Sequence, residues 1–332
     1  RLSADGPYLD EQVILVTGKM HLQPIFSESS GKIVPSLLRN FSAPVLLKDD
    51  LSSSERLHLM ANDADMFNRW DAAQTLLADQ ILAIANDPKH GVDETAIAAL
   101  AKAYANSLAD PDLLDMFKSG LLTLPAISVL ESRMTPADPV ALFHARRAVE
   151  AALGQMLAPQ IKSALTDENV AIMAKTDGGR ALLNRRLGLA VAAGDNAAIE
   201  RAAEQVHDQN MTLSQGALMA LNHCDHPARA IALQAFHDRW QDSPLVMEKW
   251  FMMESMSLVS GTVARLGELM AHPAFDANNP NKLRSVLGAF MTSNPVHFYA
   301  EDGSGFNFIG DCLIDIDARN PQFAARMALP LT

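Results

Sequence analysis

The sequence predicts a mainly α-helical protein. Antiparallel helix pairs are expected to form a curved, α-solenoid-like or bundle domain, preceded by a short β remnant of a β-sandwich domain. Hydrophobic residues make up 48% of the 332 residues but aromatic residues only 6%, because the chain is rich in Ala, Leu and Met, which favour helices. Helix-starting residue pairs recur along the chain. Runs typical of strands are confined to the first fifty residues.

Three short apolar or β-branched runs lie in this first segment, at residues 12–16, 20–26 and 33–38. Turn residues separate them, and Pro24 and Pro35 place the strands at sheet edges because proline lacks the N–H of a ladder bond. Three such strands cannot bury a two-sheet core. We therefore expect residues 1–50 to be the C-terminal strands of a β-sandwich domain whose other strands lie upstream.

Residues 51–332 are expected to form the helical C-terminal domain. Ser52 and Glu55 have the spacing of a capping box. Apolar residues then recur at helical spacing, first at Phe67, Trp70, Leu77, Ile81 and Ile84, and again at Leu142, Val149, Leu153, Met156 and Leu165. This pattern leaves Arg146, Arg147, Glu150 and Lys162 for solvent.

A capping residue followed by proline is expected to start each of several helices, since a proline at the first helical position costs no hydrogen bond. The pairs are Asp110-Pro111, Asp138-Pro139, Ser243-Pro244, Asn294-Pro295 and Asn320-Pro321. Links of a few residues, such as 241–242, force consecutive helices to run antiparallel. No repeat of fixed period is visible in the sequence.

The charge balance argues against a nucleic-acid partner. The formal net charge is -12, whereas phosphate binding needs a concentrated positive surface. No apolar run reaches the length of a membrane span. The two cysteines could form at most one bridge, which excludes a small disulfide scaffold.

Candidate chemical motifs are weak. The run His223-Cys224-Asp225-His226 lacks the second half that a four-ligand zinc site requires, and a helix-terminal histidine that bonds local carbonyls is the simpler interpretation. The segment Gly303-Ser304-Gly305 does not match a nucleophile elbow. We interpret it as a turn before a helix that begins at Phe306. No catalytic residue and no metal ligand are therefore predicted in this chain.

Seven runs of the sequence point to a known family: Phe41 to Val45, Asn68 to Gln74, Leu245 to Phe251, Asn279 through Phe290, Ser293 to Pro295, Ala300 to Gly305 and Arg319 to Gln322. These runs closely resemble the C-terminal portion of bacterial aminopeptidase N, the zinc-dependent alanyl aminopeptidase family. The matches occur in the right order between residues 41 and 326, with a more divergent middle between about 90 and 240.

The resemblance implies an enzyme of four parts, in which zinc and a glutamate activate water in an upstream catalytic domain. This chain would be a non-catalytic fragment of a cytoplasmic peptidase, predicted to be inactive alone and to hold no zinc itself. Its helical domain would enclose the active-site chamber. Arg284 and Arg326 match arginines that face the family's internal channel, and are candidates for holding the carboxylate end of a peptide. An intramolecular ion pair is the alternative for both.

The expected partners are the upstream catalytic domain of the same protein and peptide substrates, with no nucleic acid and no membrane. The chain begins at Arg1 without a methionine and stops at Thr332 directly after a helical stretch. We therefore expect an excised piece whose helical domain is incomplete at its end. A free-standing helical-repeat scaffold that binds a partner protein is the alternative function.

Overall fold

The computed structural model describes residues 33–45 and 47–331, and it is built from helices throughout this range. The helices of the first half are η1 (Arg39–Phe41), α1 (Ser53–Asn62), α2 (Met66–Asn86), α3 (Glu94–Ala109), α4 (Asp115–Leu121), α5 (Ile127–Glu131), α6 (Pro139–Met156), α7 (Ala158–Ala164) and α8 (Asp167–Met173). Those of the second half are α9 (Asp177–Ala192), α10 (Asn196–Gln205), α11 (Met211–Leu221), α12 (Pro227–Trp240), α13 (Pro244–Ser255), α14 (Thr262–Met270), α15 (Pro280–Leu283), the π-helical segment η2 (Arg284–Gly288), α16 (Ala289–Ser293), α17 (Pro295–Phe298), α18 (Ser304–Asp317), α19 (Pro321–Met327) and η3 (Leu329–Leu331). The predicted helical class is confirmed.

The predicted β remnant is not confirmed. Two of its three strands, at 12–16 and 20–26, lie outside the described residues. The third, at 33–38, is not a strand, and no strand occurs elsewhere in the described ranges. This segment is hydrogen-bonded by a side chain of α2 and not by a partner strand. The Asn68 amide donates to the Leu37 carbonyl (2.9 Å) and to the Ser36 hydroxyl (2.8 Å). Pro35 has no N–H to offer a ladder, and Val34 is buried.

Most of the predicted helix starts are confirmed. Ser52 and Glu55 form the reciprocal capping box at α1. Asp138, Asn294 and Asn320 each accept a backbone hydrogen bond at the start of a proline-led helix. α13 also begins at its proline, although the side chain of Ser243 makes no capping bond.

The predicted helix start at Asp110-Pro111 is wrong. Asp110 ends α3, and its carboxylate accepts the backbone N–H of Asp112 at 3.0 Å. Such a bond favours a turn over a helix, because the side chain satisfies the donor that a helix would use. The next helix, α4, begins only at Asp115.

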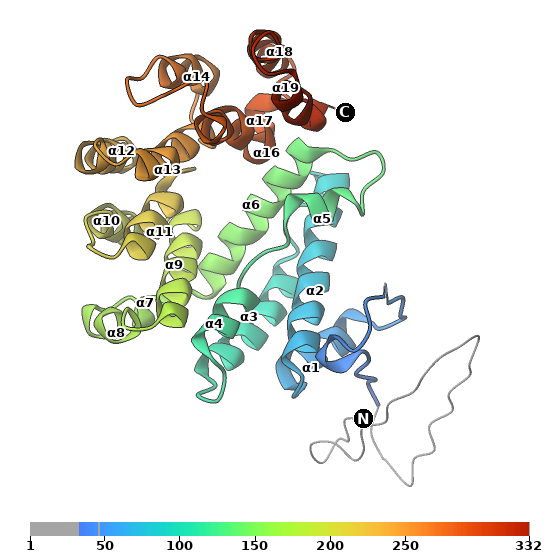
Figure 1. The fold of residues 1–332 in the computed structure, drawn as a ribbon. Helices are drawn as coiled ribbons and strands as arrows, with labels where there is room; N and C mark the ends of the chain where they lie inside the picture. The colour runs from blue at the N-terminus through green and yellow to red at the C-terminus, as the bar shows by residue number, and fades with distance from the viewer. Residues whose placement is uncertain (1–32, 46, 332) are drawn as a thin grey trace.

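Two layers of helices form the part of the chain from α7 to α14 (Figure 1). α9, α11 and α13 form the inner layer, while α7, α8, α10, α12 and α14 form the outer layer. Each inner helix contacts its neighbouring outer helix, as in α9 with α10 and α12 with α13. Links of a few residues join these helices, so neighbours run antiparallel.

The inner layer bends around helix α6. α6 contacts α9, and α9 contacts α11. At the far end of the chain, α16 contacts α17, and α17 returns to contact α6 (Figure 1). Helices far apart in the sequence therefore close a ring around the inner side of the domain.

One continuous hydrophobic core runs through both halves of the protein. Leu77, Ile81 and Ile84 of α2 are buried as predicted. Phe67 and Trp70, predicted on the same face, are only partly covered, because Asn68 and Arg69 take the interior positions. Arg69 is held there by hydrogen bonds to the Met60 carbonyl (3.0 Å) and the Ser107 hydroxyl (2.8 Å).

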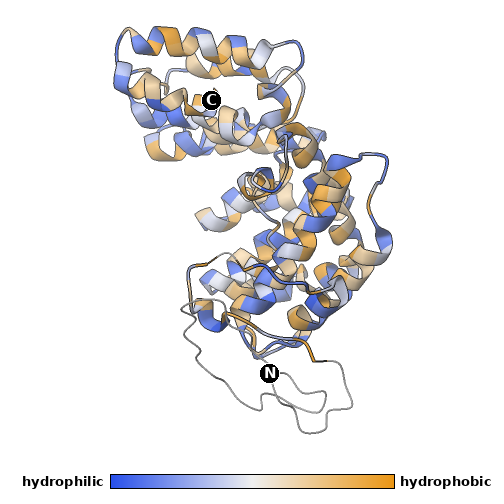
Figure 2. Ribbon diagram, turned by 90° about the vertical axis from the view of Figure 1, so that its right-hand side faces the viewer, coloured by the Kyte–Doolittle hydropathy of each residue, from blue (hydrophilic) through white to orange (hydrophobic). Residues whose placement is uncertain are grey.

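The helices carry hydrophilic and hydrophobic residues side by side (Figure 2). Within the described residues, no helix combines the length and the hydropathy needed to cross a membrane.

Candidate functional site: a cavity at the centre of the helical ring

Arg284 and Arg326, the two residues predicted from the sequence, both lie at the C-terminal end of the fold. Arg284 is exposed at the start of η2, where its Nη1 donates to the Asn281 side chain at 3.1 Å. Its guanidinium lies 5.3 Å from the ring centre of Phe323 in α19. Arg326 is exposed on the same helix α19 and has no hydrogen bond or ion pair with the described residues. Neither arginine forms an ion pair within residues 33–45 and 47–331, and their role in a channel stays a prediction.

A large cavity lies elsewhere, inside the ring of helices. Its volume is about 1090 Å³, and neither Arg284 nor Arg326 lines it. α5, α6, α9, α11 and α16 supply most of its walls. The apolar side chains that line the cavity include Ile127, Phe143, Met219, Met256 and Met291. A cavity of this size, with apolar walls and a few polar groups, is typical of small-ligand sites.

Three arginines enter this cavity: Arg146 and Arg147 from α6, and Arg185 from α9. The sequence pattern assigned Arg146 and Arg147 to solvent, and this prediction is wrong, because the ring covers that face of α6. Lys162, assigned to solvent in the same way, is exposed. The two adjacent arginines in a chain of net charge -12 were the one available signal for this site.

The arginines differ in how far their donors are satisfied. Arg146 Nε donates to the Pro125 carbonyl at 2.9 Å, and Arg147 Nη1 lies 3.1 Å from Glu150 Oε2. Arg185 has no hydrogen bond or ion pair with the described residues, and its Nε is buried. Burial lowers the pKa of Arg185, whereas the nearby Glu150 raises it. This guanidinium therefore has capacity for a further partner.

His223 lies on the wall of the same cavity, between α11 and α12. Its ring meets the edge of the Phe143 ring with centres 5.8 Å apart, and its Nδ1 is buried without a partner. Burial, followed by the positive charges of Arg147, Arg229 and Arg146, lowers the pKa of His223 to about 3. The predicted bond from this histidine to local carbonyls is absent, and the ring is neutral at physiological pH.

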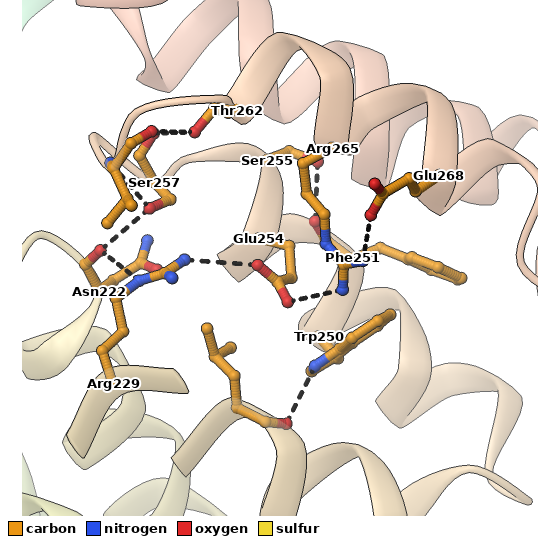
Figure 3. Close-up of polar contacts among 12 residues, drawn as sticks. Asn222, Arg229, Trp250, Phe251, Glu254, Ser255, Ser257, Thr262, Arg265 and Glu268 are labelled. Atoms are coloured by element: carbon orange, nitrogen blue, oxygen red, sulfur yellow. Dashed lines mark hydrogen bonds and ion pairs between the residues drawn. The ribbon is translucent and has the colours of Figure 1, made fainter. Parts of the chain in front are cut away.

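A polar network fixes the link that carries His223. Figure 3 shows the Glu254 carboxylate between two arginines: Arg229 Nη2 lies 3.4 Å from Oε2, and Arg265 Nη2 lies 3.1 Å from Oε1. Arg229 Nε donates to the carbonyl of Asn222, the residue before His223, at 3.0 Å. α12, α13 and α14 are thereby tied to one point of the cavity wall.

No set of three potential metal ligands occurs among residues 33–45 and 47–331. Of the run His223-Cys224-Asp225-His226, His226 instead caps α12, since its Nδ1 accepts the Ala228 N–H at 3.1 Å. The described residues therefore do not fit a zinc site.

The described residues form a protein of paired helices that surround a central cavity. The chain belongs to the family described as "Domain of unknown function (DUF3458_C) ARM repeats", which matches residues 53–332. The relationship predicted from the sequence is confirmed, because the chain is homologous to the C-terminal region of bacterial aminopeptidase N.

Aminopeptidase N of Escherichia coli (strain K12) is 33% identical over 311 residues, which cover 92% of this chain and 36% of that protein. Aminopeptidase N of Caulobacter vibrioides is also 33% identical, over 99% of this chain and 38% of that protein. The crystal structure of Legionella pneumophila aminopeptidase A in complex with aspartic acid superposes with a TM-score of 0.77 at 26% identity. That match covers 90% of this chain and 36% of the Legionella chain. The chain thus spans somewhat more than a third of the length of these relatives.

Proposed function

We propose that this chain is the non-catalytic helical part of a cytoplasmic zinc aminopeptidase, that it encloses the active-site chamber, and that it contacts the peptide. The observation that carries the proposal is the ring of helices around a cavity of about 1090 Å³ with both apolar and charged walls. Such a cavity admits an extended peptide but excludes a folded chain. The relationship to aminopeptidase N supplies the reaction class.

In this proposal, zinc and the groups that activate water belong to a catalytic domain upstream, and no step of the reaction is assigned to a residue of this chain. The helical part acts on the substrate indirectly. By limiting water around the chamber, it strengthens the electrostatic interactions inside. Arg284 and Arg326 remain the candidates for contacting a peptide along the channel, because both are exposed and form no ion pair with the described part of the chain.

Hydrolysis of an alanyl chromogenic substrate tests the proposal. The isolated chain is expected to show no hydrolysis with or without added zinc, while it binds unstructured peptides of two to six residues in a calorimetric titration. Hydrolysis by this chain alone would contradict the proposal. Binding of a folded protein together with failure to bind any short peptide would favour the free-standing scaffold instead.

A further inference from the structure

The charged groups that line the cavity leave positive charge in excess. Three arginines, Arg146, Arg147 and Arg185, face two carboxylates, Glu131 and Glu150, so one positive charge is left over. Glu150 acts on both Arg146 and Arg185. The charge of Glu131 instead acts on Tyr299, whose pKa is raised by burial and by this carboxylate. Around the arginines themselves, one carboxylate therefore faces three guanidinium groups.

Unpaired donors and acceptors mark where a ligand would bind. Leaving a buried polar group without a partner destabilises the folded state, so native proteins keep few of them. Two residues that line this cavity carry such atoms: the buried Nε of Arg185 and the buried Nδ1 of His223. His223 also experiences the positive charges of Arg147, Arg229 and Arg146, which lower its pKa further. An anion in the cavity would give the Arg185 guanidinium a hydrogen-bond acceptor and would offset the positive charges around His223.

The cavity walls favour a carboxylate that is attached to an apolar group. A guanidinium binds a carboxylate through two parallel hydrogen bonds. Phe143, Met219, Met256 and Met291 stand on the same walls, and methionines adapt to apolar groups of varied shape. A free phosphate could satisfy the arginines but would leave these apolar walls uncovered.

We infer that the cavity binds the C-terminal carboxylate of a short peptide, with Arg185 as the main partner of the carboxylate and the methionine-lined wall as the place of the last side chain. The inference rests on the proposed function for the nature of the ligand. It assigns the terminal carboxylate to this cavity and not to Arg284 and Arg326. Those two arginines could still contact the rest of the peptide.

A calorimetric titration of the chain with an N-acetylated pentapeptide that ends in leucine tests the inference. The free acid is expected to bind at least about ten-fold more tightly than the C-terminal amide, since a hydrogen bond to a charged group contributes about 1.5–3 kcal/mol. Arg185→Gln is expected to abolish this preference. The matched control Arg133→Gln removes an arginine that pairs with Asp79 outside the cavity, and should keep it.

Four results would overturn the inference: no binding of either peptide, equal binding of acid and amide, an acid preference that survives Arg185→Gln, or a preference lost in Arg284→Gln instead. Displacement of the peptide by inorganic phosphate at equal concentration would also overturn it, in favour of a free anion. The comparison of acid and amide uses the wild-type chain, so it remains decisive even where Arg185→Gln fails to fold. Equal binding of both peptides would contradict the carboxylate site and leave the proposed function standing. Hydrolysis by the chain would contradict the proposed function.

Discussion

The Glu254 carboxylate lies 3.4 Å from the Arg229 guanidinium, and the two side chains are only 10% and 11% exposed. Glu254 also accepts a bond from Arg265 at 3.1 Å, so one buried carboxylate connects three helices beside the cavity (Figure 3). Removing one partner of a buried ion pair leaves an uncompensated charge, which costs more than the pair contributes.

Glu254→Gln is therefore expected to lower the free energy of unfolding by about 3 kcal/mol. The matched control is Glu268→Gln, because Glu268 also pairs with Arg265 (2.7 Å) but is 64% exposed. An exposed pair contributes about 0–1 kcal/mol. Urea denaturation of the three proteins measures both changes. Equal destabilisation by the two substitutions would mean that the Glu254 network does not hold the helices together.

Two glycines of helix α18, Gly305 in its first turn and Gly310 in its middle, differ in the space around them. A Cβ on Gly305 would lie 2.2 Å from the His297 carbonyl oxygen and 2.5 Å from that of Phe298, whereas a Cβ on Gly310 would meet nothing within 4 Å. Gly305→Ala is thus expected to destabilise the protein by several kcal/mol, because backbone must move. Gly310→Ala is expected to stabilise it by about 0.5–1 kcal/mol, as alanine favours a helix interior. Thermal unfolding followed by circular dichroism distinguishes the two, and a neutral Gly305→Ala would contradict the close approach.

The same helix shows how far the sequence could predict the fold. The positive φ of Gly303 (71°) agrees with the predicted turn, but the helix begins at Ser304 rather than at Phe306. Gly305 is required by a neighbouring backbone and not by its own conformation. Local signals such as the Ser52 capping box are complete within four residues and were therefore predictable. A close approach between segments depends on packing that no local pattern records.

The cavity escaped prediction for a similar reason. Arg146 and Arg147 lie on the polar face of α6, which the pattern of a single helix assigns to solvent. That face borders a cavity that α9, α11 and α16 also line, and α17, about 150 residues later, returns to contact α6. The strand predicted at 33–38 failed because apolar alternation does not reveal whether a partner strand or the Asn68 side chain will satisfy the backbone.

Acid is expected to weaken the folded state through His223. Its pKa is lowered to about 3, mainly by burial and then by nearby arginines, while an unfolded histidine has a pKa near 6.5. Between these two values the unfolded state binds a proton that the native state does not, so stability falls as the pH falls from about 6.5 toward 3. The contribution is at most about 1.4 kcal/mol per pH unit, the slope for one proton.

His223→Leu is expected to reduce this slope, because the titrating group is gone. The exposed His144, a neighbour of the same Phe143 ring, offers the control His144→Leu, which should leave the slope as in the wild type. Urea midpoints at pH 7, 6, 5 and 4 give the measurement. An unchanged slope in His223→Leu would show that other groups cause the acid sensitivity.

Arg284 and Arg326 give the prediction that links this chain to catalysis. In a complete aminopeptidase that contains this chain, replacing either by Ala is expected to raise KM for peptides about two- to five-fold, because an exposed charge contact contributes up to about 1 kcal/mol. If the arginines contact only the peptide beyond the first residue, as proposed, KM for amino-acid amides should stay the same and kcat should not change. Arg319→Ala is the control, because Arg319 is a similarly placed arginine already paired with Asp315 on α18. Equal increases for peptides and amides, or an equal effect of Arg319→Ala, would rule out a peptide contact and leave Arg284 and Arg326 as ordinary surface charges.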